Sequence, residues 1–184
     1  MKKLMLASML LAIAVSPALA SDWIGAFEDP AGFDCEMTDV AAGSKFVYIV
    51  HHTDAGSTGS EFLVNADQTT FSYASTQIGA GFFALGEANT GISIAYNACV
   101  TGTFGTFVAC RVTYDILGTT APCARVILDE DPNAVPPVRI YADCLGGFKP
   151  FVGGQLTVNP NGSCSCGDFA VEPATWGSIK ALYR

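Results

Sequence analysis

Apolar and polar residues alternate most regularly over residues 106–117, TFVACRVTYDIL. Every second residue from Val108 to Ile116 is apolar or nearly so, and charged residues such as Arg111 lie between them. A period of two is typical of a β-strand with one face in a core and the other in water. The pattern therefore predicts a long central strand over residues 106–117.

Shorter segments of the same kind recur along the chain, and segments rich in Gly, Pro, Ser and Asp separate them. The patterns predict strands over residues 22–27, 45–52, 61–65, 70–73, 81–85, 91–96, 124–129, 138–143 and 155–158. No convincing helical period occurs before residue 171. Regularly spaced short strands are typical of a sandwich or jelly roll, so we expect an all-β sandwich of about nine strands.

The first 20 residues, MKKLMLASMLLAIAVSPALA, have the organisation of a secretory signal peptide. Two lysines precede an apolar run, and Ala18-Leu19-Ala20 forms a small-x-small cleavage site. The apolar run is shorter than the roughly 20 residues that span a bilayer, which favours cleavage over a retained membrane helix. We therefore expect cleavage after Ala20, a secreted or periplasmic protein, and no stable membrane span after cleavage.

The rest of the chain divides into a β-sandwich domain over residues 21–170 and a C-terminal tail over residues 171–184. Thr175 can cap a short helix in the tail, although Gly177 weakens this prediction. The alternatives are that the tail packs on the sandwich, docks on a partner, or serves as an export or anchoring address. The candidate docking residues of the tail are Trp176, Ile179, Lys180, Leu182, Tyr183 and Arg184.

The chain is acidic, with 17 Asp and Glu against 9 Lys and Arg and a net charge of −8. The acidic residues are scattered rather than gathered in runs, so the charge indicates solubility. A basic stripe is absent from the sequence, which argues against a nucleic-acid partner.

All seven cysteines follow the expected leader, and export at this density favours disulfides over a zinc site. If residues 124–129 and 138–143 form an antiparallel hairpin, Cys123 and Cys144 lie opposite each other just beyond the strand ends. The sequence therefore predicts a disulfide between Cys123 and Cys144.

The other cysteines leave more than one pairing open. Cys164 and Cys166 are too close in sequence to bond each other without strain, so we expect each to bond elsewhere, with Cys35 and Cys99 as the candidates. Cys110 lies on the inward face of the predicted central strand, and we expect it to be the unpaired thiol.

No constellation of catalytic or metal-binding residues stands out. His51 and His52 are the only histidines, and adjacent strand residues point to opposite faces. The acidic turn over residues 129–133 offers oxygen ligands for Ca²⁺, although a solvated turn is the favoured interpretation. The sequence has no Gly-x-Ser-x-Gly elbow, Cys-x-x-Cys motif or phosphate-binding loop. We therefore expect no catalytic residue, no cofactor and no metal, with Ca²⁺ as the alternative.

Four aromatic residues, Phe71, Tyr73, Phe82 and Phe83, lie in the least regular part of the chain. Exposed aromatic side chains on one face of a sandwich can contact a sugar ring or a protein. Burial in the core is the favoured interpretation for all four.

The segments KFVYIVHH, SEFLVNAD, GISIAY and FGTFVACRVTYDIL cover roughly residues 44–117. Their order and texture resemble the cohesin-type sandwich and its carbohydrate-binding-module relatives, which are jelly rolls in exported bacterial proteins. The resemblance implies a jelly roll, but not a dockerin partner, because no dockerin-contacting surface can be matched. The ending NPNGSCSCG followed by TWGSIKALYR resembles that of a group of secreted bacterial proteins and implies no particular activity.

We therefore expect an exported, non-enzymatic module that binds a protein or a glycan, or builds part of an envelope or extracellular assembly. The alternative from another class is a small exported metal- or thiol-dependent enzyme or redox protein that uses Cys164, Cys166, His51 or His52. A purely structural domain without a ligand is a third possibility.

Overall fold

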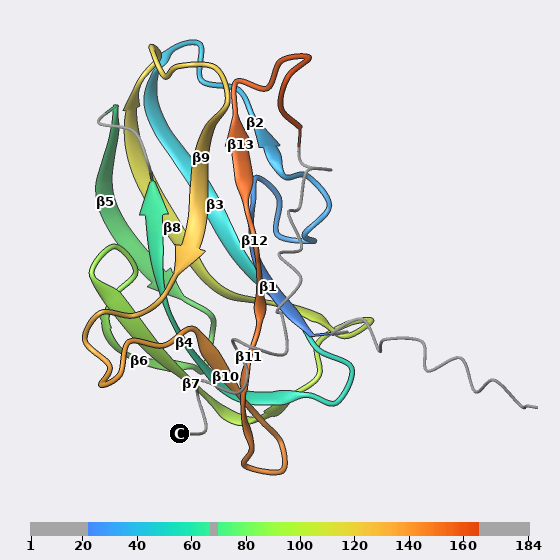
Figure 1. Cartoon of the computed structure of the whole chain (residues 1–184). Helices are drawn as coiled ribbons and strands as arrows, with labels where there is room; N and C mark the ends of the chain where they lie inside the picture. Colours follow the sequence, from blue (N-terminus) through green and yellow to red (C-terminus); the bar gives the residue numbers. More distant parts are fainter. Residues whose placement is uncertain (1–21, 67–69, 166–184) are drawn as a thin grey trace, which may run out of the picture.

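Two β-sheets face each other in the computed structural model of the protein, which describes residues 22–66 and 70–165 (Figure 1). The described residues contain no helix, so the fold is an all-β sandwich. Within this part of the chain, no helix has the length and apolar character needed to cross a membrane. The predicted signal peptide over residues 1–20 and the tail over residues 171–184 lie outside the described residues.

The first sheet has five strands in the order β12-β1-β3-β8-β5. Their bounds are β1 Trp23–Phe27, β3 Ala42–His52, β5 Phe71–Ile78, β8 Thr106–Leu117 and β12 Val152–Gly154. The strand β8 is antiparallel to β3 and β5, and β12 is parallel to β1. The bounds of β8 confirm the strand predicted over residues 106–117.

The second sheet follows the order β11-β10-β4-β9-β13-β2, with β7 paired to β4 and β6 paired to β7. Its strands are β2 Glu36–Met37, β4 Ser57–Ala66, β6 Phe83–Glu87, β7 Gly91–Val100, β9 Ala124–Asp129, β10 Ile140–Asp143, β11 Phe148–Pro150 and β13 Leu156–Val158. Because β4 pairs with β7, β10 and β9, it is the central strand of this sheet.

The inward residues of both sheets form the hydrophobic core. On β8, Val112, Tyr114 and Ile116 are at most 2% exposed, and the alternate residues point outward. On β4, Phe62 and Val64 are buried in the same way. The alternation that predicted the strands therefore also determines which face of each sheet is covered.

The predicted hairpin of residues 124–129 and 138–143 is wrong. Both β9 and β10 run antiparallel to β4, β9 along residues 63–66 and β10 along residues 57–61. The two strands therefore run in the same direction and continue one another along β4. Residues 130–139 form a loop between them rather than a reversal of the chain, and Asp131 and Val138 make only an isolated bridge.

The predicted disulfide between Cys123 and Cys144 is wrong for the same reason. Cys123 precedes β9 and Cys144 follows β10, so they lie at opposite ends of a line that runs along β4. Instead, Cys144 bonds Cys99 and Cys123 bonds Cys164.

The remaining cysteines behave differently from one another. Cys35 is disulfide-bonded as well, and Cys166 lies outside the described residues. Cys110 is buried in β8 with a free thiol, and burial raises the pKa of that thiol to about 12. A thiol with such a pKa is protonated at neutral pH and is a poor nucleophile.

Candidate binding face on the second sheet

A hollow of about 460 Å³ lies on the outer side of the second sheet, over β4, β6, β7, β10 and β11. Large apolar side chains stand open to solvent around it. Phe83 is 68% exposed, Leu85 is 79% exposed and Phe148 is 74% exposed. We call this surface the apolar face, and its apolar side chains are Phe83, Leu85, Ala95, Ile140, Ala142 and Phe148.

The strand register explains why the apolar face is hollow. One row of directly paired residues crosses all five strands and consists of Phe83, Ala95, Gly59, Ala142 and Phe148. Paired residues share one face of a sheet, so this row has large rings at both ends and small residues between them. The difference in side-chain size produces a trough with an aromatic wall on each side.

A second row lies beside the first and contains the charged residue of the hollow. It consists of Leu85, Ser93, Glu61, Ile140 and Pro150. Glu61 is half-buried in the middle of this row, on the central strand β4. Among the described residues that line the hollow, it is the one with a charged side chain.

Gly59 keeps the floor of the trough low. A Cβ atom at this position would lie 2.7 Å from the carbonyl oxygen of Ile94, closer than real Cβ contacts. A larger residue at position 59 would therefore push β4 away from β7 and fill the trough at the same time. The glycine serves both the strand pairing and the shape of the apolar face.

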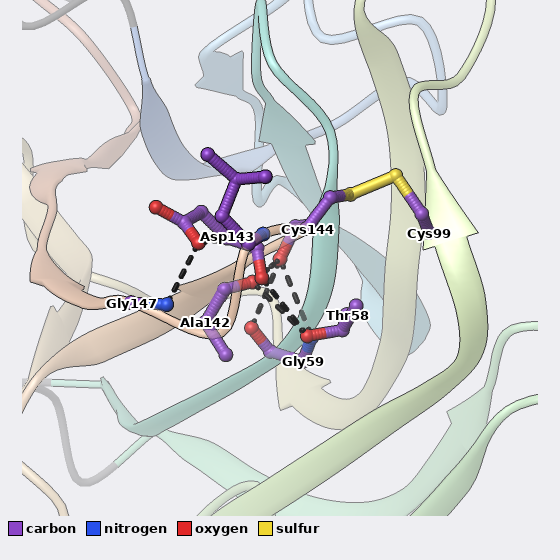
Figure 2. Close-up of a disulfide and its surroundings, with 9 residues drawn as sticks. Thr58, Gly59, Cys99, Ala142, Asp143, Cys144 and Gly147 are labelled. Atoms are coloured by element: carbon purple, nitrogen blue, oxygen red, sulfur yellow. Dashed lines mark hydrogen bonds between the residues drawn. A yellow bond between two sulfur atoms is a disulfide. The ribbon is translucent and has the colours of Figure 1, made fainter.

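A disulfide closes one end of the apolar face (Figure 2). Ser57, at the start of β4, pairs with Val100 of β7 and with Asp143 of β10, and the cysteines next to these two residues form the bond. The Cys99–Cys144 bridge therefore ties together the strands that flank β4. A Cβ atom on Gly56 would lie within 2.8 Å of both sulfur atoms, so the bond packs directly on the chain that enters β4.

Hydrogen bonds fix the turn that positions Phe148. The Asp143 carboxylate accepts the backbone N–H group of Gly147 at 2.8 Å (Figure 2). It also accepts the N–H group of Leu145 at 2.9 Å, and its Oδ2 lies 3.0 Å from the Lys149 ammonium. The Gly147 and Leu145 N–H groups and Lys149 hold the pKa of Asp143 below its usual value. The β10–β11 turn is therefore closed around a carboxylate, and it holds Phe148 at the edge of the trough.

A second apolar hollow, of about 520 Å³, lies between the loop after β1 and the β7–β8 turn. Phe33 and Phe104 line it and are 88% and 96% exposed. The Asp29 carboxylate fixes the first loop because it accepts the backbone N–H groups of residues 31, 33 and 34.

The two histidines do not meet, as their adjacent positions on a strand predict. His51 is fully buried, with Nδ1 3.3 Å from the Tyr96 hydroxyl, while His52 stacks on Trp23 at the surface. Cys164 is held in its disulfide with Cys123. The alternative of a metal or thiol site therefore finds none of its candidate residues together in the described part of the chain.

The acidic turn over residues 129–133 is held by hydrogen bonds between its own residues. Asp131 is buried, and its Oδ1 accepts the backbone N–H of Asn133 at 2.8 Å and the side-chain N–H of the same residue at 3.0 Å. Residues 22–66 and 70–165 hold no group of three or more His, Cys, Asp or Glu arranged to bind a metal ion.

The aromatic residues of the irregular region separate into two groups. Phe71, Tyr73 and Phe82 pack against the core, as expected, whereas Phe83 is exposed on the apolar face. The alternation of residues 83–87 could have shown that Phe83 is exposed, because it places Phe83 and Leu85 on one side of the strand and Ala84 on the other. Phe148 was not identified at all, since a three-residue strand shows no period.

The fold is similar to that of solved cohesin domains. A type II cohesin domain from the cellulosome of Acetivibrio cellulolyticus matches with a TM-score of 0.54 at 11% identity, over 76% of this chain and 95% of that chain. The sixth cohesin of scaffoldin B from the same organism gives 0.51 at 12%, over 77% and 99%. A non-cellulosomal cohesin from the archaeon Archaeoglobus fulgidus gives 0.50 at 11%, over 78% and 94%.

No protein-family model matches the chain, and no curated protein matches it in sequence. At identities this low, the structural similarity shows a cohesin-like β-sandwich and nothing finer. It confirms the fold that the sequence resemblance implied.

Proposed function

We propose that this protein is a non-enzymatic module that binds a protein partner through the apolar face. The observation that carries the proposal is the row of residues with a phenylalanine at each end and small residues between them. A contiguous apolar surface of this kind is typical of a protein contact rather than of open solvent. The cohesin of similar fold from Acetivibrio scaffoldin B is itself described in complex with a protein, a dockerin.

The shape of the face favours an extended ridge as the occupant. The trough runs along β4 between Phe83 on β6 and Phe148 on β11, and it fits one helix or strand of a partner, whose apolar side chains would lie between the two rings. The strands beneath are joined by the Cys99–Cys144 bond, so the surface is formed before binding. A preformed surface loses less conformational entropy on association than a flexible one.

We also propose that the module works outside the cytoplasm. The support is the leader-like sequence of residues 1–20 together with disulfides, which persist in oxidising compartments.

A matched pair of leucine substitutions tests the binding proposal. Leu85 on the apolar face and Leu117 at the end of β8 are both exposed strand residues, at 79% and 64%. Displayed random peptides would be selected on the wild-type protein and their affinities then measured on Leu85→Asp and Leu117→Asp. We expect Leu85→Asp to weaken binding by roughly tenfold or more, since a buried leucine contributes about 1.5–3 kcal/mol.

Leu117→Asp should bind the same peptides as the wild type, because Leu117 lies on the other sheet. Selected peptides that bind Leu85→Asp unchanged would contradict the proposal. Retention of the protein on immobilised neutral glycans that depends on Leu85, without any peptide binding, would replace the protein partner by a glycan.

A further inference from the structure

Glu61 is a carboxylate in the middle of an apolar surface. It lies between Ser93 and Ile140 in the second row of the face. No hydrogen bond or ion pair joins its side chain to another residue within the described ranges. Its half-buried position leaves it in contact with water only while the face is open.

The nearest strands offer no positive charge to it. Lys149 of β11 is held by the carboxylate of Asp143, and Arg139 donates from Nη1 to the carbonyl of Leu128 at 2.7 Å. Neither cation lines the hollow. Within residues 22–66 and 70–165, therefore, no cation is placed over Glu61.

An entirely apolar partner would cover Glu61 without replacing the water that it loses. Burial of an unpaired charge costs several kcal/mol, which would offset much of the gain from burying the surrounding apolar surface. A cation placed over the carboxylate removes that cost and adds a charge-assisted hydrogen bond. Glu61 therefore favours partners that place a cation over it, and disfavours partners that are entirely apolar.

We propose that the partner presents a Lys or Arg side chain over Glu61, within an otherwise apolar segment. This inference rests on the proposed function, because it concerns the same face. The acidic net charge of the chain, −8, acts in the same direction by attracting a basic partner from a distance.

Charge reversal at one position tests the inference. Random peptides would be selected separately on the wild-type protein, Glu61→Gln and Glu61→Lys. Glutamine keeps the size of the side chain and removes only its charge. We expect Lys or Arg among the apolar residues of peptides selected on the wild type, no such preference with Glu61→Gln, and Asp or Glu with Glu61→Lys.

The coupling between the two charges gives a second measurement. In one selected peptide, the basic residue would be replaced by a neutral residue of similar length and the affinity measured on the wild type and Glu61→Gln. Either single change should weaken binding by roughly tenfold, and the second change should then add little.

The two proposals fail in different ways. Wild-type peptides that depend on Leu85 but show no excess of Lys or Arg would overturn the role of Glu61 and leave the binding face intact. Basic peptides selected equally by Glu61→Lys would overturn it as well. Binding that is independent of Leu85 would overturn the face and the role of Glu61 together.

Discussion

At the scale of single residues, His51 is an ionisable side chain in an apolar environment. It is fully buried, with ring contacts to Tyr96, Phe107 and Tyr141. Its Nε2 has no hydrogen-bond partner among the described residues. Burial lowers the pKa of His51 from 6.5 to about 4, because the charged imidazolium would lose its hydration in this apolar site.

The fold should therefore lose stability in mild acid. Below pH 6.5 the unfolded chain gains a proton at His51, whereas the folded chain stays neutral down to about pH 4. The free energy of unfolding should fall progressively over this window by about 3 kcal/mol and not fall further from this cause below it. Denaturant unfolding at pH 7, 5.5 and 4 measures the loss.

The variant His51→Phe is the control, since it keeps an aromatic ring and cannot take up a proton. It should show a smaller loss over the same window. The lowered pKa of Asp143 acts at more acidic pH, because its contribution is lost only below the ordinary value of 3.8. A wild-type free energy of unfolding that is constant between pH 7 and 4 would contradict the role of His51.

At the scale of elements, the backbone conformation of the β7–β8 turn does not suit one of the residues that form it. Thr103 and Thr106 exchange both backbone hydrogen bonds, and the residues between them, Phe104 and Gly105, have φ values of 52° and 78°. Two positive φ values make a type I′ turn, in which Asn-Gly is the preferred pair. A phenylalanine in the left-handed region is strained, and this one is also 96% exposed.

The substitution Phe104→Asn should therefore stabilise the protein. Asparagine adopts the left-handed conformation more readily, so the free energy of unfolding should rise by about 1 kcal/mol. The matched control is Phe33→Asn, since Phe33 is similarly exposed at 88% but is not among the positive-φ residues. Equal effects of the two substitutions in denaturant unfolding would show that turn strain is not the cause.

The strands also show how much of the fold could be predicted from the sequence alone. The period of two located β8 and its inward face, because that information is local. It placed β9 and β10 in a hairpin because the alternation of a strand carries no direction, and only their common partner β4 reveals that they run the same way. The predicted cysteine pairing was wrong because it was inferred from this hairpin, which the structure does not contain.

The apolar face could not be predicted for a related reason. Its two aromatic walls, Phe83 and Phe148, belong to strands that are far apart in sequence and meet only across β7, β4 and β10. Burial, the favoured expectation for Phe83, is the more common outcome for an aromatic residue. The sequence therefore predicted the sandwich well and the proposed binding surface poorly.

At the scale of the whole molecule, the Cys99–Cys144 and Cys123–Cys164 disulfides overlap along the chain. Cys99–Cys144 spans a separation of 45 residues and Cys123–Cys164 a separation of 41. In chain order, each bond encloses one end of the other. The loop over residues 130–139, between β9 and β10, lies inside both, and Val135 in this loop is 98% exposed.

This overlap determines what happens when a protease cuts the chain. A cut beside Val135 leaves Cys99 and Cys123 on one fragment and Cys144 and Cys164 on the other, so both bonds cross the break. With a specific cleavage site inserted after Ala134, the nicked protein should migrate as one species without reductant and as two with it. Two fragments without reductant would show that the bonds are paired differently. With these pairings, cleavage of this exposed loop cannot release either half of the sandwich.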